Sequence, residues 1–170
     1  MIFGIDNGLS GAVVQLSDCD GCAPIAATLM PCMKVVGHNE IDGRALAQWV
    51  RDAAGTAKER VIVAIEECPE HAKQKSIMRS MAMSYGIIVG SIRALCPHFL
   101  IVRVRSGNAK DSWQREMLGI ITGDTKGKAK EVAEHIWPGH HWHKTKAGSE
   151  AMRDAALIAE FVRREIHQKK

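Results

Sequence analysis

The sequence predicts one α/β domain spanning residues 1–170, with a mixed five-stranded sheet and helices on both faces. Three strand patterns follow one another directly, separated only by turns, and this order favours antiparallel pairing. Two further strand patterns each come after a helical pattern, which favours parallel pairing through crossover helices. The 170 residues, 46% of them hydrophobic and 25% charged, suffice for a single domain with its own core.

The first three strands are expected at residues 2–6, 11–16 and 24–30, and a Gly-Leu-Ser-Gly turn joins the first two. The stretch "DGRALAQWVRDAAG" then predicts a helix, because Asp42 is a good N-cap and Gly55 a good terminator.

The fourth strand is expected in "RVIVAIEE", an almost uninterrupted apolar run of the kind found in fully buried strands. The fifth is expected in "FLIVRVR" at residues 99–105. The remaining helical patterns cover residues 71–95, 110–118, 126–136 and 149–167.

An aspartate stands in the middle of the apolar stretch "GIDNGLSGAV". Burying a carboxylate without a partner is costly, so Asp6 needs an explanation. It either caps the following turn by accepting nearby N–H groups or belongs to a metal or phosphate site. This stretch alone does not decide between the two.

Three further acids favour the metal site. Glu66 ends its buried strand as Asp6 ends the first, and the two meet if these strands are neighbours. Glu150 and Asp154 are four residues apart and share one face of the last helix, although an acid in the first turn, as Glu150 would be, is also favoured by the helix dipole. Converging carboxylates repel one another unless cations neutralise them, and oxygen ligands suit Mg²⁺ or Mn²⁺. Two such ions cleave phosphodiesters, so the pattern indicates a nuclease.

The net charge of +4 is concentrated in one stretch. Residues 103–146 hold nine basic and five acidic residues, while the rest of the chain is balanced. A local basic excess favours a polyanionic partner, although solvated lysines on a helix face are the common alternative. The candidate nucleic-acid contacts are Lys73, Lys75, Arg79, Arg105, Lys110, Lys126 and Lys128.

The five cysteines are expected to be reduced. No basic segment precedes an apolar N-terminal run and no apolar stretch reaches membrane-spanning length, so we expect a cytoplasmic protein with no membrane partner. Two weaker metal hypotheses remain open. One is a zinc site at Cys19, Cys22, Cys32 and His38, and the other is a histidine site in "GHHWH", a stretch that follows Trp-Pro-Gly and is better interpreted as a polar surface turn.

The chain resembles the RuvC-type Holliday junction resolvases of the RNase H-like superfamily, and most closely their small phage-encoded branch. The resemblance lies in "GIDNGLSGAV", "VAIEE", "KSIMRSMAMSYGIIVGSIRAL" and "MRDAALIA", and also in "DTKGKAKEVAEHIWPG" and the Trp of "KDSWQREMLG". It implies an RNase H-like fold and a homodimeric endonuclease that nicks four-way DNA junctions with two Mg²⁺ ions, in recombination, repair or phage genome processing.

By this resemblance Asp6, Glu66 and Asp154 match the family's metal-binding carboxylates. Many relatives carry a fourth acid or a histidine where this chain has Ala151, so Glu150 is the natural substitute. Glu67 is the fallback, although it is expected on the opposite face of its strand. Bacterial members can carry an aromatic wedge three residues after the glutamate, where this chain has Pro69.

Other functions fit the sequence less well. An actin-like or sugar-kinase ATPase needs two related domains, which 170 residues cannot supply. A non-catalytic binding module should lack a core acid, and none is missing. Cleavage of other branched DNA or of RNA–DNA hybrids stays open.

A homodimer is expected through residues 77–95. One apolar stripe of this helix is Ile77, Met81, Tyr85, Ile88 and Ile92, and Met78, Ala82, Met83 and Val89 extend apolar surface to other faces. The alternative is that helices 110–118 and 126–136 cover this surplus within one chain.

Overall fold

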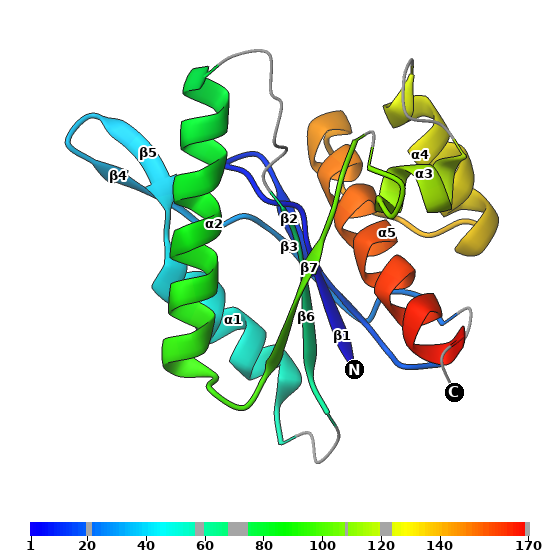
Figure 1. Cartoon of the computed structure of the whole chain (residues 1–170), viewed down its shortest axis with the longest axis horizontal. Helices are drawn as coiled ribbons and strands as arrows, with labels where there is room; N and C mark the ends of the chain where they lie inside the picture. The colour runs from blue at the N-terminus through cyan, green and yellow to red at the C-terminus, as the bar shows by residue number, and fades with distance from the viewer. Residues whose placement is uncertain (20–21, 57–59, 68–74, 108, 120–123, 169–170) are drawn as a thin grey trace.

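The computed structural model describes residues 1–170 apart from residues 20–21, 57–59, 68–74, 108, 120–123 and 169–170, and apart from the side chains of Lys75 and Ile77. Pro69, Cys68 and Lys73 therefore lie outside the described residues. The central sheet has five strands in the order β3-β2-β1-β6-β7 (Figure 1). The strands are β1 (Ile2–Ile5), β2 (Ala12–Leu16), β3 (Ala26–Leu29), β6 (Ile62–Glu66) and β7 (Leu100–Val104).

The pairing confirms the predicted mixed sheet. β1 pairs antiparallel with β2, and β2 pairs antiparallel with β3. β1 pairs parallel with β6, and β6 pairs parallel with β7. β1 therefore lies between β2 and β6. Because β1 and β6 are parallel, their carboxyl ends lie at the same edge of the sheet.

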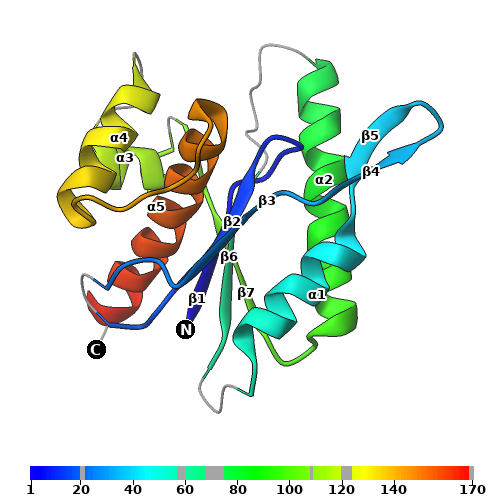
Figure 2. The same cartoon turned by 180° about the vertical axis from the view of Figure 1, so that it is seen from behind.

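Helices cover both faces of the sheet, as Figures 1 and 2 show from opposite sides. α1 (Gly43–Ala54) and α2 (Lys75–Leu95) lie on one face. α3 (Trp113–Leu118), α4 (Thr125–Ile136) and α5 (Lys146–Gln168) lie on the other. Successive side chains of β1 point to opposite faces of the sheet. Phe3 and Ile5 therefore pack towards α1 and α2, whereas Ile2 packs towards α5.

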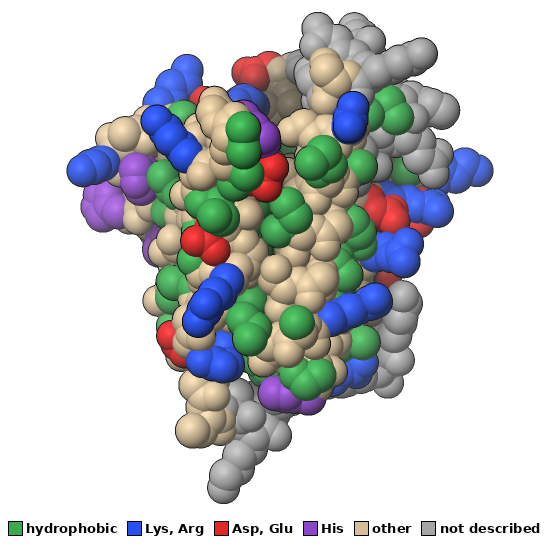
Figure 3. Space-filling model, turned by 90° about the vertical axis from the view of Figure 1, so that its left-hand side faces the viewer, with side chains coloured by type: hydrophobic (Ala, Val, Ile, Leu, Met, Phe, Trp, Pro, Cys, Tyr) green, Lys and Arg blue, Asp and Glu red, His purple; other side chains and the backbone are tan. Residues whose placement is uncertain are grey.

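The outer surface of α2 is not covered within the described part of the chain. The predicted alternative, that helices 110–118 and 126–136 cover it, is wrong, because α3 and α4 pack with α5 on the opposite face. Figure 3 shows this side of the molecule, where hydrophobic side chains in green and backbone or other side chains in tan fill much of the middle. Exposed residues of α2 there include Ala82, Met83, Gly86, Gly90 and Ala94.

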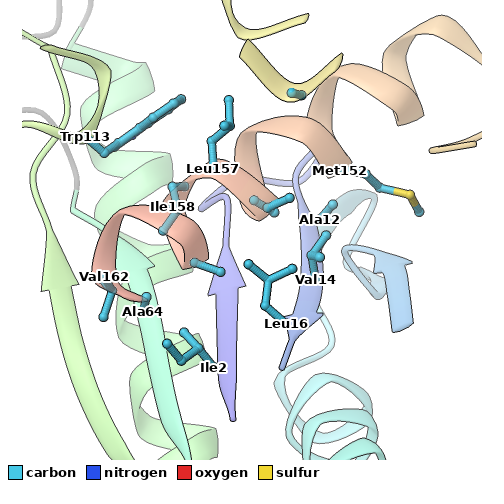
Figure 4. Close-up of a cluster of buried hydrophobic side chains, with 14 of the residues drawn as sticks. Ile2, Ala12, Val14, Leu16, Ala64, Trp113, Met152, Leu157, Ile158 and Val162 are labelled. Carbon is cyan, nitrogen blue, oxygen red and sulfur yellow. The ribbon is translucent and has the colours of Figure 1, made fainter. Parts of the chain in front are cut away.

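The long helix α5 packs directly on the sheet, and its inward side chains form the core shown in Figure 4. The contact is closest at Gly4, where an added Cβ would overlap the backbone of Ala155 and the side chain of Ala159. Glycine is therefore required at this position of β1, because only a residue without a side chain admits the helix backbone.

A small second sheet was not predicted. β4 (Cys32–Val35) and β5 (His38–Ile41) form a separate antiparallel hairpin beside α2 (Figure 1). Its turn consists of Val36 at φ 44° and Gly37 at φ 86°. Two positive φ angles are typical of the tightest hairpin turns, which usually carry Asn-Gly, so the Val-Gly pair concealed the turn in the sequence.

The expectation of reduced cysteines is wrong for two of them. Cys19 and Cys22 form a disulfide across the loop between β2 and β3, where their Cα atoms lie 5.7 Å apart. This separation is within the ordinary range for bridged cysteines. Neither thiol is then free for the hypothetical zinc site, and Cys32 and Cys96 are free thiols. None of the described helices is both long and apolar enough to cross a membrane.

Candidate functional site

The register of the sheet brings two of the predicted acids together. Ile5 is paired with Ile65, so Asp6 and Glu66 follow at the same level on adjacent parallel strands, about 4.8 Å apart. Side chains along a strand point alternately to the two faces of the sheet, so Asp6 is on the same face as Ile2, and Glu66 is on the same face as Ile62. Ile2 and Ile62 pack in the core beneath α5. Asp6 and Glu66 therefore point to the α5 face, at the carboxyl ends of β1 and β6.

The third acid comes from α5. Asp154 immediately precedes Ala155, whose backbone lies against Gly4 of β1. The close approach of helix and strand thus sets Asp154 beside the end of β1, and its charge interacts with those of both Asp6 and Glu66. The sequence prediction that these three carboxylates converge is consistent with this geometry.

Burial and mutual repulsion make these acids hard to ionise. Burial, and then the adjacent charge of Glu66, raise the pKa of Asp6 from 3.8 to about 7. Burial, and then the charge of Asp6, raise the pKa of Asp154 from 3.8 to about 7 as well. Burial also raises the pKa of Glu66, which is 8% exposed.

Glu66 is held in place by a residue that the sequence did not single out for this purpose. The indole Nε1 of Trp113 donates to Glu66 Oε1 at 3.0 Å, and Trp113 is 2% exposed. Ser112 caps α3 by accepting a hydrogen bond from the Arg115 N–H, which fixes Trp113 as the first residue of the helix. A Trp directly after a capping Ser was visible in the sequence, but its target depends on where α3 packs.

Glu150 lies nearby with a different environment. Its carboxylate accepts a hydrogen bond from Lys126 Nζ at 2.7 Å, and this interaction lowers its pKa. The helix begins at Lys146, three residues earlier than predicted, because Thr145 Oγ1 accepts from the Gly148 N–H. Glu150 is therefore not in the first turn, and the helix-dipole explanation for it does not apply.

The fallback ligand points away from the cluster. Glu67 lies 3.6 Å from Arg103 and 4.0 Å from Arg105, measured between charged atoms. Both arginines are next to Val104 in the chain, so their side chains point to the opposite face of the sheet from that of Val104, which packs in the core beneath α5. The structure thus agrees with the prediction that Glu67 is on the other face of its strand.

The donor set fits a hard divalent cation, although it is not a preformed cage. Three carboxylates face one another, and among the described residues none of the three forms an ion pair with a basic side chain. No group of three or more His, Cys, Asp or Glu side chains in the described ranges already has the spacing of a metal site. Carboxylate oxygens are the ligands that Mg²⁺ and Mn²⁺ prefer.

The predicted basic contacts are spread over several elements. Arg79 and Lys110 are exposed, and Arg105 lies 3.2 Å from Asp111. Lys126 and Lys128 both come from the first two turns of α4, and Lys128 lies 2.8 Å from Glu131. Lys73 and the Lys75 side chain lie outside the described residues.

The "GHHWH" stretch has a structural role at His143, whose Nδ1 accepts from the Thr145 N–H just before α5 begins. His140 packs edge-on against Trp142. These interactions agree with the interpretation of this stretch as a surface turn.

Comparison with known proteins then identifies the fold. No protein-family model matches the chain, and no curated protein matches it by sequence. Among solved structures, RuvC of T. thermophilus in complex with a Holliday junction substrate matches with a TM-score of 0.55 and 14% identity, over 96% of this chain and 94% of that one. The chain has the RuvC fold. A second Thermus thermophilus RuvC structure matches with a TM-score of 0.56 and 14% identity, over 96% of this chain and 95% of that one.

The match to RuvC spans nearly the whole of both chains, so it includes both helical layers and is not confined to one strand–helix unit. It confirms the predicted RNase H-like architecture. At 14% identity the likeness establishes the fold, while the chemistry has to be argued from this chain's own residues.

Proposed function

We propose that the protein is a metal-dependent endonuclease that cleaves four-way DNA junctions. The observation that carries this proposal is the group of three carboxylates, the buried Glu66 and the half-buried Asp6 and Asp154, none of which forms an ion pair with a basic side chain among the described residues. A fold shared with a RuvC bound to a Holliday junction supports the choice of substrate. The activity would serve recombination, repair or phage genome processing in the cytoplasm of a bacterial or phage-infected cell.

Asp6, Glu66 and Asp154 would hold the divalent cations, with Mg²⁺ the expected ion and Mn²⁺ a substitute. When two such ions are bound, they activate a water and stabilise the oxygen that leaves the phosphodiester. The chain's own contribution is orientation, because Trp113 fixes the carboxylate of Glu66 and the close approach at Gly4 fixes Asp154. Carboxylates bind cations in their ionised form, and the pKa of Asp6 is raised to about 7, so cation binding would favour loss of its proton.

The basic side chains would bind DNA phosphates and not base edges. Within the described residues the candidates are Lys126 and Lys128 on α4, Arg79 on α2, Arg105 and Lys110, whereas Lys73 and the Lys75 side chain lie outside them. Replacing one lysine or arginine that neutralises a phosphate should flatten the dependence of log K on log salt by about 0.9. Combined alanine substitutions that leave both affinity and this slope unchanged would contradict the assignment.

A homodimer would supply the two active sites that symmetric cleavage of a four-way junction requires, because one chain offers one acid cluster. The outer surface of α2 is the proposed interface. Met83 is 50% exposed there, and a Cβ added at Gly86 or Gly90 would have no other part of the described structure within 4 Å, so packing among the described residues does not require these glycines. Small residues would let a second α2 approach closely.

The oligomeric state is tested by sedimentation at micromolar concentration, with and without junction DNA. Gly86→Arg places a long charged side chain on this surface without an internal clash. The wild type should sediment as a dimer and Gly86→Arg as a monomer. A wild type that stays monomeric even on the junction contradicts paired incision by a homodimer.

The activity is tested by incubating the protein with a four-way junction, a linear duplex and an RNA–DNA hybrid in Mg²⁺. We expect paired nicks in the junction, little cleavage of the duplex, and no cleavage by Asp6→Asn. Preferred cleavage of the hybrid or of other branched DNA would move the assignment to a different nuclease of the same fold. Binding of the junction by the wild type with no cleavage in Mg²⁺ or Mn²⁺ would make the protein a binding module.

A further inference from the structure

Glu150 is surrounded by lysines and not by the other acids. Its Oε2 accepts from Lys126 Nζ at 2.7 Å, and its Oε1 lies 4.0 Å from Lys146 Nζ. The Glu150 side chain is 17% exposed, whereas that of Lys126 is 65% exposed. Both oxygens of this carboxylate therefore face ammonium groups, and the more closely bound of the two is that of Lys126.

The position of Lys126 is fixed by the start of its helix. Asp124 caps α4 by accepting from the Gly127 N–H at 2.8 Å, and a Cβ at residue 127 would collide with that capping carboxylate. α4 in turn packs against α5. The backbone of Lys126 is thus held in place independently of the ion pair. Glu150 determines only where the flexible end of the Lys126 side chain lies.

This location is at the rim of the acid cluster. Glu150 and Asp154 are one helical turn apart on α5, so the carboxylate that binds Lys126 lies about 6 Å along the axis from the level of Asp154. The positive charge of Lys126 acts on the cluster. Burial raises the pKa of both Asp6 and Asp154, and Lys126 opposes part of this rise. An ammonium group has three donors, so the hydrogen bond to Glu150 leaves two for an incoming oxygen.

We propose that Glu150 is a positioning residue, which holds the Lys126 ammonium group at the rim of the carboxylate cluster for the DNA phosphate to be cleaved, and is not the fourth metal ligand. This inference rests on the proposed nuclease function. If Glu150 bound a metal ion, its hydrogen bond to Lys126 would be lost. The ammonium group would then lie near the metal ion without its carboxylate partner, and the two positive charges would repel each other. Held by Glu150, the same lysine is aimed at the phosphate that approaches the metal site.

Three explanations of the Lys126–Glu150 pair make different predictions. A fourth metal ligand predicts that removal of the Glu150 carboxylate weakens metal binding. A simple surface ion pair, worth little in general, predicts no effect on either metal binding or cleavage. A positioning role predicts normal metal binding with slower cleavage, and dependence of the Glu150 effect on Lys126.

The test uses Glu150→Gln, Lys126→Met and the double variant. The matched control is Glu131→Gln, because Glu131 also lies 2.8 Å from a lysine of α4, Lys128. Mn²⁺ affinity is measured by calorimetry without DNA, and folding by urea denaturation. Cleavage is measured as the single-turnover rate on a four-way junction with enzyme saturating, so that weaker DNA binding does not enter.

We expect Glu150→Gln to bind Mn²⁺ within about twofold of the wild type and to cleave about tenfold more slowly, as is usual when a positioning hydrogen bond is removed. Lys126→Met should be slowed at least as much, and the double variant should be no slower than Lys126→Met alone, because the two residues act as one unit. The variant Glu131→Gln should cleave at the wild-type rate.

A tenfold or larger decrease of Mn²⁺ affinity in Glu150→Gln would make Glu150 a ligand and overturn the inference. Unchanged cleavage, or rate effects that multiply in the double variant, would overturn it as well while leaving the nuclease assignment intact. A wild type that cleaves no substrate would instead remove the proposed function, and the inference with it.

Discussion

Two carboxylates on the same helix have opposite surroundings. Glu160 of α5 is 2% exposed, and its oxygens accept hydrogen bonds from Arg163 and Arg164 at 2.7 Å. Asp154, less than two turns earlier, has no such partner among the described residues and lies beside Asp6 instead. The fold therefore neutralises the buried Glu160 and leaves the half-buried Asp154 facing other acids.

The difference separates structural acids from functional ones. Arg163 and Arg164 follow Glu160 at i+3 and i+4, so the sequence itself supplies the cations that burial of that carboxylate requires. Among the described residues, no guanidinium group forms an ion pair with Asp6, Glu66 or Asp154. In our account the positive charge that this cluster needs is supplied by bound metal ions.

The largest expected effect is the loss of cleavage in Asp154→Asn. Removing one anionic ligand should lower the single-turnover rate on a four-way junction by about a thousandfold or more, because metal ions supply several kcal/mol of transition-state stabilisation. Junction affinity should stay near that of the wild type, since the basic side chains are intact. Glu134→Gln, an exposed acid on α4, is the matched control. Rapid cleavage by Asp154→Asn in Mg²⁺ would contradict the site.

The opposite result is expected at Glu160. Glu160→Gln leaves the buried Arg163 guanidinium without its carboxylate and should lower the free energy of unfolding by about 3 kcal/mol, as measured by urea denaturation. The cleavage rate per folded molecule should be unchanged. If Glu160→Gln is as stable as the wild type, the contrast between the two acids of α5 fails.

A smaller effect is expected when the donor to Glu66 is removed. Trp113→Phe keeps an aromatic ring but removes the Nε1 hydrogen bond, which should slow cleavage by about 10- to 100-fold, as removal of an orienting hydrogen bond behind a metal ligand usually does. Trp137→Phe is the control, since Trp137 is also buried but donates to the Cys22 carbonyl oxygen. Equal effects of the two substitutions would indicate a packing role only.

The smallest effect is a difference in pH dependence. The pKa values of Asp6 and Asp154 are raised from 3.8 to about 7, so the folded metal-free protein binds more protons than the unfolded chain between these values. These two groups therefore make the protein less stable as pH rises from about 4 to above 7. Between pH 5 and 8, the free energy of unfolding of Asp154→Asn should fall less than that of the wild type. Identical slopes in the metal-free state would contradict the raised pKa values.

The parts of the site that depend on strand pattern could be predicted from the sequence. Asp6 and Glu66 each end an apolar strand, and the strand order that makes them neighbours follows from three turn-linked strands followed by a crossover. Asp154 could be predicted because the helix pattern around it is long and regular. These features depend on local periodicity, which the sequence shows directly.

The parts that depend on tertiary packing could not be predicted. Trp113 reaches Glu66 only because α3 packs near the end of β6, and Lys126 reaches Glu150 only because α4 packs on α5. The β4–β5 hairpin is hard to detect because its strands have four residues each and its turn carries Val36 where Asn is usual. The Cys19–Cys22 disulfide depends on how one loop brings the two cysteines together. The expectation of reduced cysteines rested only on the expected cytoplasmic location, which says nothing about this loop.

The central claim is that bound cations complete the carboxylate cluster, and calorimetric titration of the DNA-free protein with Mn²⁺ tests it most directly. The wild type and Glu160→Gln should both bind Mn²⁺, and saturating metal should raise their thermal stability. Asp6→Asn and Asp154→Asn should bind at least about tenfold more weakly and gain little stability. A folded wild type that binds no Mn²⁺, or variants of Asp6 and Asp154 that bind it as tightly as the wild type, would contradict the account.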